Sequence, residues 1–223
     1  PKVLQRSKKV KIGELGKYRT LAGMQQFAAA WDESTLRHLL RRTLFGFKQE
    51  DINAFKGRSM AEVVQLLVSP SLAPLPPVNN YNDSNFSDPT VPAGQTWVNA
   101  PYDGNANGRR NSSLKSWWIG NLIQQTSSVH EKMTLFWHNH FAIESVDVND
   151  ARYMYRYYSL LRKYALGNFK DLVLEITKDP AMLRYLNGYQ NNKNAPDENY
   201  ARELQELFTL GKGPLVFYTE ADV

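Results

Sequence analysis

The chain has 223 residues, and 27 Lys plus Arg against 22 Asp plus Glu give it a net charge of +5. Seven of these basic residues and one acid lie within residues 1–19, so the rest of the chain carries −1 and does not favour a nucleic-acid-binding domain. Cys is absent, which excludes disulfides and Cys nucleophiles, and the sequence has no run of 18 apolar residues that would predict a membrane span.

Apolar residues recur at helical spacing along most of the chain. The first such stretch follows the capping residue Asp32 and ends near Gly46. The S-x-x-E form of a capping box at residues 59–62 and 128–131 predicts that two more helices start there. Further helices are predicted over residues 113–125, 149–164, 168–177, 180–186 and 196–210. The sequence therefore predicts an all-α, irregular multi-helix domain.

Residues 69–110 differ in composition, with seven Pro and many Asn, Ser, Asp and Gly. Because Pro removes backbone donors and Asn, Asp and Gly favour turns, we expect a long irregular loop over this segment. Its aromatic residues Phe86, Trp97 and Tyr102 favour a loop that wraps on the domain surface and buries them. We therefore expect a basic arm over residues 1–30 and one all-α domain over residues 31–223.

The segment from Phe136 to Phe141 holds two of the four histidines, His138 and His140. Imidazole is a common ligand of Zn²⁺ and other divalent metals, and a carboxylate would complete such a site. On an α-helix, however, residues two apart point about 200° away from each other. His138 and His140 can therefore share one ion only if the helix ends or unwinds between them. Otherwise one ring packs in the core and the other faces a cleft or solvent.

A second polar stretch lies on the predicted helix over residues 196–210. At about 100° per residue, Glu198, Arg202 and Glu206 form a polar stripe of i, i+4 pairs that is typical of a solvated helix face. Asn199 and Glu203 lie at the boundary with the apolar face, where a half-buried carboxylate needs a partner such as a His, an Arg or a metal ion.

Two other sequence patterns are weaker indications of a functional site. Residues 103–108 match the first half of an EF-hand loop, but position twelve is Leu114 where a bidentate Glu is required, so an Asn/Gly turn explains them better. Residues 152–163 mix Tyr with Arg and Lys, as nucleic-acid surfaces do. Tyr and Arg on an amphipathic helix more often form the edge of a core.

Five blocks carry a family resemblance: residues 39–46 (LLRRTLFG), 131–141 (EKMTLFWHNHF), 165–169 (ALGNF), 179–183 (DPAML) and 199–211 (NYARELQELFTLG). In this order they resemble the bacterial family known as domain of unknown function 1800, over roughly residues 33–223. The resemblance implies a bacterial protein and favours an exported one. It also leads us to expect that this chain is the N-terminal portion of a longer protein.

Our leading hypothesis places a polar site at the His138/His140 segment together with Glu203, Arg202, Asn199, Glu198 and Glu206. In an enzyme, His138, His140 and Glu203 would hold a divalent metal ion that activates water for hydrolysis, and Arg202 would stabilise anionic charge. The alternative is a non-enzymatic cell-envelope module in which these groups form a structural network and the long loop contacts a polysaccharide or protein partner. A third possibility is a scaffold without a site of its own.

Overall fold

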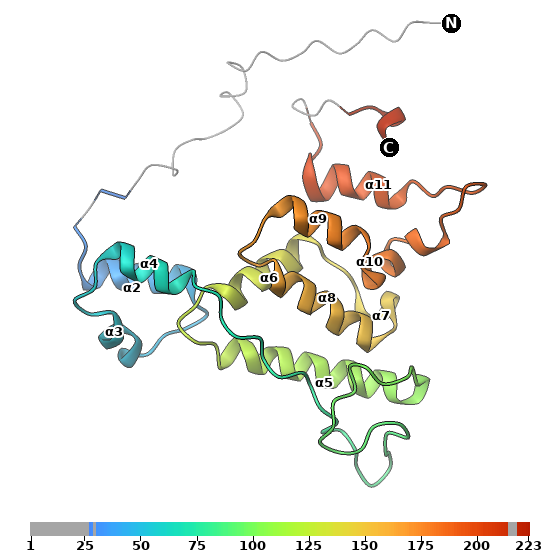
Figure 1. Ribbon diagram of the computed structural model, residues 1–223, viewed down its shortest axis with the longest axis horizontal. Helices are drawn as coiled ribbons and strands as arrows, with labels where there is room; N and C mark the ends of the chain where they lie inside the picture. The colour runs from blue at the N-terminus through green and yellow to red at the C-terminus, as the bar shows by residue number, and fades with distance from the viewer. Residues whose placement is uncertain (1–26, 29, 214–217) are drawn as a thin grey trace, which may run out of the picture.

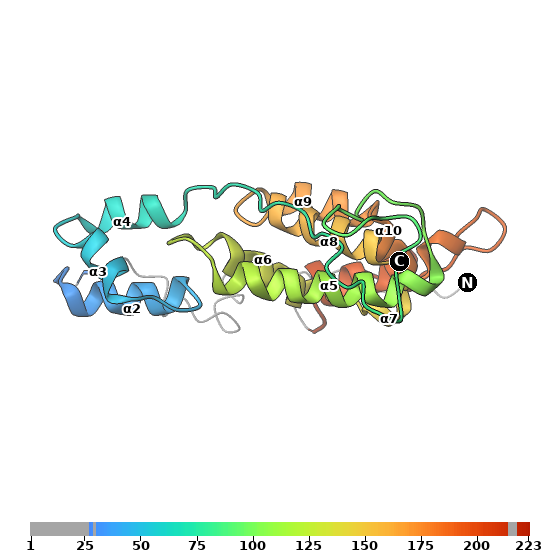
Figure 2. The same ribbon diagram turned by 90° about the horizontal axis from the view of Figure 1, so that it is seen from below.

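A computed structural model describes residues 27, 28, 30–213 and 218–223 of the chain. Within these residues the fold is all-α, as predicted, and the β-structure amounts to isolated bridges such as Val78 with Thr96. Most of the predicted basic arm lies outside the described residues. Figures 1 and 2 show a small group of helices at one end of the molecule and a larger helical body beside it.

The small group, which we call the N-terminal lobe, consists of α2 (Glu33–Thr43), α3 (Gln49–Phe55) and α4 (Met60–Leu67). The predicted caps are confirmed for α2 and α4, where the side chains of Asp32 and Ser59 accept from backbone N–H groups in the first turn. The sequence did not indicate α3. The lobe has its own core of Leu36, Leu40, Leu44, Ile52, Phe55, Val63 and Leu67.

Short polar contacts join the N-terminal lobe to the body. The backbone N–H of Val129 donates to Leu67 O at 2.9 Å, and Lys132 Nζ donates to Leu44 O at 2.9 Å. The side chain of Ser128 also points to this junction, with Leu67 O 3.3 Å away. The predicted capping box at residues 128–131 is therefore wrong, because Ser128 bonds the lobe and the helix starts at His130 without a side-chain cap.

The body contains the remaining helices. They are α5 (Gly104–Ile123), α6 (His130–His140), α7 (Ser145–Val148), α8 (Ala151–Lys163), α9 (Phe169–Thr177), α10 (Pro180–Tyr185), η1 (Gly188–Gln190), α11 (Asn199–Glu203), the π-helix η2 (Leu204–Thr209) and η3 (Glu220–Asp222). Helix α8 lies in the middle, where α5, α6, α7, α9 and α10 all contact it. The main core gathers around it: Phe141, Ile143, Val148, Tyr157, Leu161, Leu172, Ile176, Ala181, Met182 and Phe208.

The irregular segment between α4 and α5 is shorter than predicted. Helix α5 begins at Gly104, and the side chain of Asp103 caps it by accepting from the N–H groups of Asn105 and Ala106 at 2.9 and 2.8 Å. The half EF-hand pattern is therefore the first turn of a helix and not an Asn/Gly turn. The segment wraps along the body as expected, with Trp97 fully buried, although Tyr102 stays 48% exposed.

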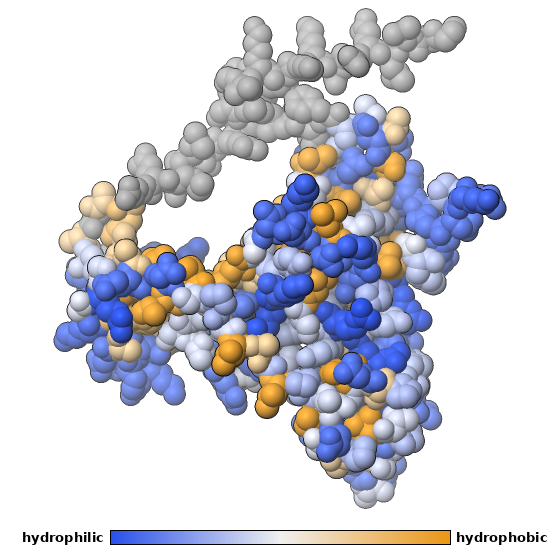
Figure 3. Space-filling model, in the orientation of Figure 1, coloured by the Kyte–Doolittle hydropathy of each residue, from blue (hydrophilic) through white to orange (hydrophobic). Residues whose placement is uncertain are grey.

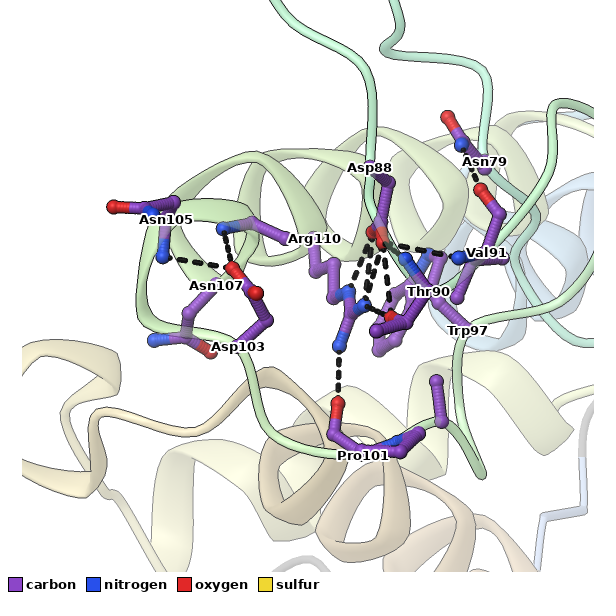
Figure 4. A network of polar contacts seen from close by, with 12 residues as sticks. Asn79, Asp88, Thr90, Val91, Trp97, Pro101, Asp103, Asn105, Asn107 and Arg110 are labelled. Atoms are coloured by element: carbon purple, nitrogen blue, oxygen red, sulfur yellow. Dashed lines mark hydrogen bonds and ion pairs between the residues drawn. The ribbon is translucent and has the colours of Figure 1, made fainter.

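A buried ion pair fixes this segment against α5 (Figure 4). The guanidinium of Arg110 donates to both oxygens of Asp88 at 2.9 Å, and the two side chains are only 2% and 0% exposed. Arg110 also donates to Pro101 O at 2.8 Å and to the Thr90 hydroxyl at 2.7 Å. Burial by itself would raise the pKa of Asp88, but the hydrogen bonds from Tyr81, Thr90 and Arg110 outweigh it and lower the pKa to about 2.

Helix α10 begins at another buried carboxylate, Asp179. As the N-cap residue it accepts from the N–H of Ala181 at 2.8 Å, and Pro180 follows at the first helical position. Burial raises the pKa of Asp179 to about 6, and the backbone hydrogen bonds from Ala181 and Met182 offset only part of that rise. At neutral pH the Asp179 carboxyl group is therefore ionised, although its buried surroundings favour the protonated form.

Of the helices in the described part of the chain, none combines the length and the apolar character that a bilayer crossing requires.

We predict that Arg110→Ala lowers the free energy of unfolding by about 3–5 kcal/mol, because it leaves the Asp88 carboxylate buried without its cation. Urea unfolding at neutral pH measures the loss. Arg109→Ala is the matched control, since the neighbouring Arg109 pairs with Asp83 at the surface. Arg109→Ala should unfold at nearly the same urea concentration as the parent protein. Equal losses for the two variants would contradict the role given to the buried pair.

We predict that Asp179→Asn stabilises the protein at pH 8 and not at pH 4. Because folding raises the pKa of Asp179 from 3.8 to about 6, its stability contribution is full below pH 4 and is lost as pH rises through 6. Asn caps a helix as well as Asp and carries no charge, so the gain at pH 8 should reach up to about 3 kcal/mol. Thermal unfolding from pH 4 to 8 measures it, with Asp171→Asn on the exposed side of α9 as the control. A gain that does not change with pH would refute this explanation.

Candidate functional site

On the face shown in Figure 3, apolar residues are interspersed with polar ones. Cavities are the other places where a folded chain can hold a ligand. One cavity of about 210 Å³ lies in the body where α5, α6, α7 and α8 meet, and His138 lines it. We call it the His138 pocket.

The spacing of residues on the helices explains how this pocket forms. Helix α5 contributes Asn111, Leu114, Lys115 and Trp118, which are the i, i+3, i+4 and i+7 positions of one helix face, and α8 contributes Met154, Tyr157 and Tyr158 in the same way. His138 comes from the last turn of α6, and Ile143 and Ser145 come from the connection to α7 and its first residue. Helices α5, α6 and α8 thus supply most of the walls, and the connection between α6 and α7 completes them.

His138 and Trp118 lie next to each other in the pocket wall. Their rings meet edge to face with centroids 4.7 Å apart. Burial lowers the pKa of His138, so its imidazole is neutral at pH 7 and can both donate and accept a hydrogen bond. Among the described residues, the indole Nε1 of Trp118 is buried and has no hydrogen-bond partner. Because this nitrogen has almost no accessible surface, a ligand in the pocket would contact the Trp118 ring and not its N–H.

A buried network holds the α8 wall of the pocket. Tyr158 donates to Glu131 Oε2 at 2.9 Å, and Arg162 Nε donates to Glu131 Oε1 at 2.7 Å. Burial, followed by the nearby Glu131 carboxylate, raises the pKa of Tyr158, so this hydroxyl stays a donor at neutral pH. Tyr157 donates to Phe141 O at 2.5 Å, and burial raises its pKa too. Both tyrosines therefore present their rings to the pocket while their hydroxyls are bonded elsewhere.

His140 does not join His138. Helix α6 continues through both residues, so the two rings leave the helix on different sides, as the helical geometry predicts. The Nε2 atom of His140 bonds Phe208 O at 2.8 Å, and the ring lies among the aromatic rings of Phe141, Phe169 and Phe208. The structure therefore brings His140 to α11 and η2 (residues 199–209), which we call the C-terminal helical segment, and leaves His138 in the pocket.

Arg202 lies in a network of carboxylates. It pairs with Glu198 at 2.6 Å, with Glu220 at 2.5 Å and with Glu206 at 3.7 Å, while Glu206 also pairs with Lys212 at 2.5 Å. The hydrogen bonds to Glu220 and Glu198 raise the pKa of Arg202. The predicted polar stripe is confirmed as a ladder of ion pairs, and the guanidinium is already occupied by protein carboxylates.

Asn199 and Glu203 have different surroundings. The backbone N–H of Asn199 donates to Asp197 Oδ1 at 2.8 Å, and its side chain donates to Leu186 O at 3.4 Å. Glu203 Oε2 is buried and has no hydrogen-bond partner within the described residues. In that same part of the chain, no group of three or more His, Asp or Glu side chains is arranged to hold a metal ion. The structure thus does not assemble His138, His140 and Glu203 into one site.

Two other cavities are less suited to a ligand. An open groove of about 450 Å³ lies beside Asp179, between α8 and the start of α10. A polar cavity of about 310 Å³ lies beside Arg162, but its charged groups Arg162 and Glu131 already bond each other. The enclosed His138 pocket combines apolar walls with a few polar groups that have room for a partner, which is the usual character of a ligand site.

Sequence reasoning missed most of the residues around His138. The i, i+3, i+4, i+7 spacing of residues 111–118 was available as a signal, but the predicted helix started at residue 113 and so excluded Asn111. The pair of Glu131 and Arg162 had no local signal, because the two residues lie on different helices.

Comparison with known proteins gives a family. A model of the family described as "Protein of unknown function (DUF1800)" matches residues 38–223. Neither a curated protein nor a solved structure matches the chain. The matched region begins within α2 and includes every residue of the His138 pocket and of the Arg202 network. The chain therefore belongs to the family of proteins of unknown function DUF1800.

Proposed function

We propose that the protein is a non-enzymatic binding domain that holds a small ligand in the His138 pocket. The observation that carries this proposal is the cavity of about 210 Å³ itself, whose mostly apolar walls include the polar side chains of Asn111, His138 and Ser145. Such a combination of apolar surface with a few polar groups is typical of small-molecule sites. The neutral imidazole of His138 offers a ligand a group that can both donate and accept a hydrogen bond.

The contacts of the predicted catalytic residues support a structural role for them. Arg202 bonds the carboxylates of Glu198 and Glu220, so it does not need an anionic substrate to be satisfied. His140 bonds a backbone carbonyl of the C-terminal helical segment. Arg202 therefore links α11 to η2 and η3, and His140 links η2 to α6, which is what a structural network does.

The irregular segment supports placing the ligand in the pocket and not on that segment. Trp97, the largest of its aromatic side chains, packs in the interior against Val91, Val98 and Leu114. Its ring is therefore not available to stack on a polysaccharide.

Export to the cell envelope stays a prediction from the family resemblance, and fractionation of the bacterial cell checks it.

We predict that small fragments bind in the pocket and that Ser145→Phe abolishes their binding. A library of monocyclic fragments, screened by NMR through the indole N–H of Trp118, should contain ligands with Kd on the order of 1 mM. The Phe side chain at position 145 would fill much of the 210 Å³ cavity and exclude them.

Ser116→Phe is the matched control, because Ser116 is an exposed residue of α5 outside the pocket lining. It should leave the fragment affinities unchanged. If no fragment shifts the Trp118 indole signal, or if Ser145→Phe binds the fragments as well as the parent protein, the binding proposal is wrong.

We predict that His140→Ala lowers the free energy of unfolding by about 1–3 kcal/mol, since it removes the bond to Phe208 O and leaves a cavity among aromatic rings. Chemical denaturation measures the loss. His38→Ala, at an exposed position of α2, should cost little by comparison. A His140→Ala variant as stable as His38→Ala would show that His140 is not part of a structural network.

A further inference from the structure

The residues that line the His138 pocket include a basic residue but no acidic one. The lining contains the cation of Lys115 and the neutral side chains of Asn111, Trp118, His138 and Ser145, and it contains no Asp or Glu. Lys115 lies on the same face of α5 as Trp118, one turn before it. A ligand in this pocket therefore meets one positively charged residue and no negatively charged residue.

We propose that the ligand is a small monocarboxylate with an apolar body, whose carboxylate lies beside Lys115. This proposal rests on the proposed function of the pocket and names the chemical class that fills it. A carboxylate accepts hydrogen bonds from a lysine ammonium, and hydrogen bonds between charged partners are about twice as strong as neutral ones.

The cation of Lys115 is available for such a contact. It takes part in none of the ion pairs found in residues 27, 28, 30–213 and 218–223. Glu131, the buried acid of α6 that accepts from Tyr158 in the pocket wall, is paired with Arg162 at 2.7 Å and does not cancel the lysine charge. The local field therefore favours an anion over a cation of the same shape.

The amount of charge favours a monoanion. A phosphate monoester carries about −1.5 to −2 charges at pH 7, and a single lysine beside a neutral His138 would leave much of that charge uncompensated in a partly enclosed site. A carboxylate carries one negative charge, which Lys115 matches.

The remaining walls determine the body of the ligand. Leu114, Ile143 and Met154 are apolar, and Tyr157 and Tyr158 present rings whose hydroxyls are bonded elsewhere. The volume of about 210 Å³ lies below the range of drug-sized sites, about 300–1,000 Å³, so the ligand is about the size of a single substituted ring or a short chain.

Benzoate and its neutral isostere benzamide test the charge at constant shape, and benzylammonium tests the opposite sign. The affinity of each probe is measured by NMR titration of the Trp118 indole N–H in the parent protein and in Lys115→Met. Lys170→Met is the control, because Lys170 is an exposed residue of α9 outside the pocket. Lys115 is itself exposed, so its substitution tests charge without threatening the fold.

We expect benzoate to bind about fivefold more tightly than benzamide, and benzylammonium to bind most weakly. Lys115→Met should weaken benzoate about fivefold and leave benzamide unchanged, whereas Lys170→Met should change neither. If benzamide or benzylammonium binds as tightly as benzoate, or if Lys115→Met has no effect, the carboxylate class is wrong while the pocket remains a binding site. If no probe shifts the Trp118 signal, the carboxylate proposal fails, and a fragment library that also fails to shift it removes the pocket as well.

Discussion

The ion pair between Arg162 on α8 and Glu131 on α6 constrains the rest of the body. Separating two charges in the protein interior costs several kcal/mol, so the two helices have to keep the register that joins them. Arg162 also donates to Ser71 Oγ at 2.7 Å and to Leu72 O at 2.8 Å, which ties the segment after α4 to α8. Tyr158 bonds the second oxygen of Glu131, so the same pair fixes a wall of the His138 pocket.

How much of the fold the sequence predicts depends on the range of the contacts that decide each element. Helices α2 and α4 are predicted well, because a capping side chain and an amphipathic pattern lie within a few residues of each other. The start of α5 is missed because Asn and Gly favour turns locally, whereas Arg110 and the segment it binds hold the first turns as helix. Ser128 is misjudged because a distant contact again decides its role: its hydroxyl bonds the carbonyls of Leu67 and Ser69, about 60 positions earlier.

The candidate site is less predictable than the fold. Helical geometry alone correctly separates His138 from His140, because α6 does not unwind between them. Helical geometry does not predict which residues surround His138. Trp118 and Tyr158 lie about 20 residues away on either side and reach the pocket only because α5 and α8 pack on α6. The pairs of Arg202 with Glu198 and Glu206 are predictable because they are four residues apart along one continuous helical stretch, whereas the pair with Glu220 has no local signal.

The end of the C-terminal helical segment explains why His140 stands where it does. The last carbonyl groups of a helix have no partner within it, and here the segment stops before Gly211, whose φ of +81° turns the chain away. Phe208 O is one of these carbonyls, and a carbonyl oxygen only accepts, so Nε2 of His140 carries the proton and donates to it at 2.8 Å. A metal ion at Nε2 would displace that proton and leave the carbonyl unpaired. The bond that caps the helix therefore opposes metal binding at this nitrogen and favours the structural role of His140.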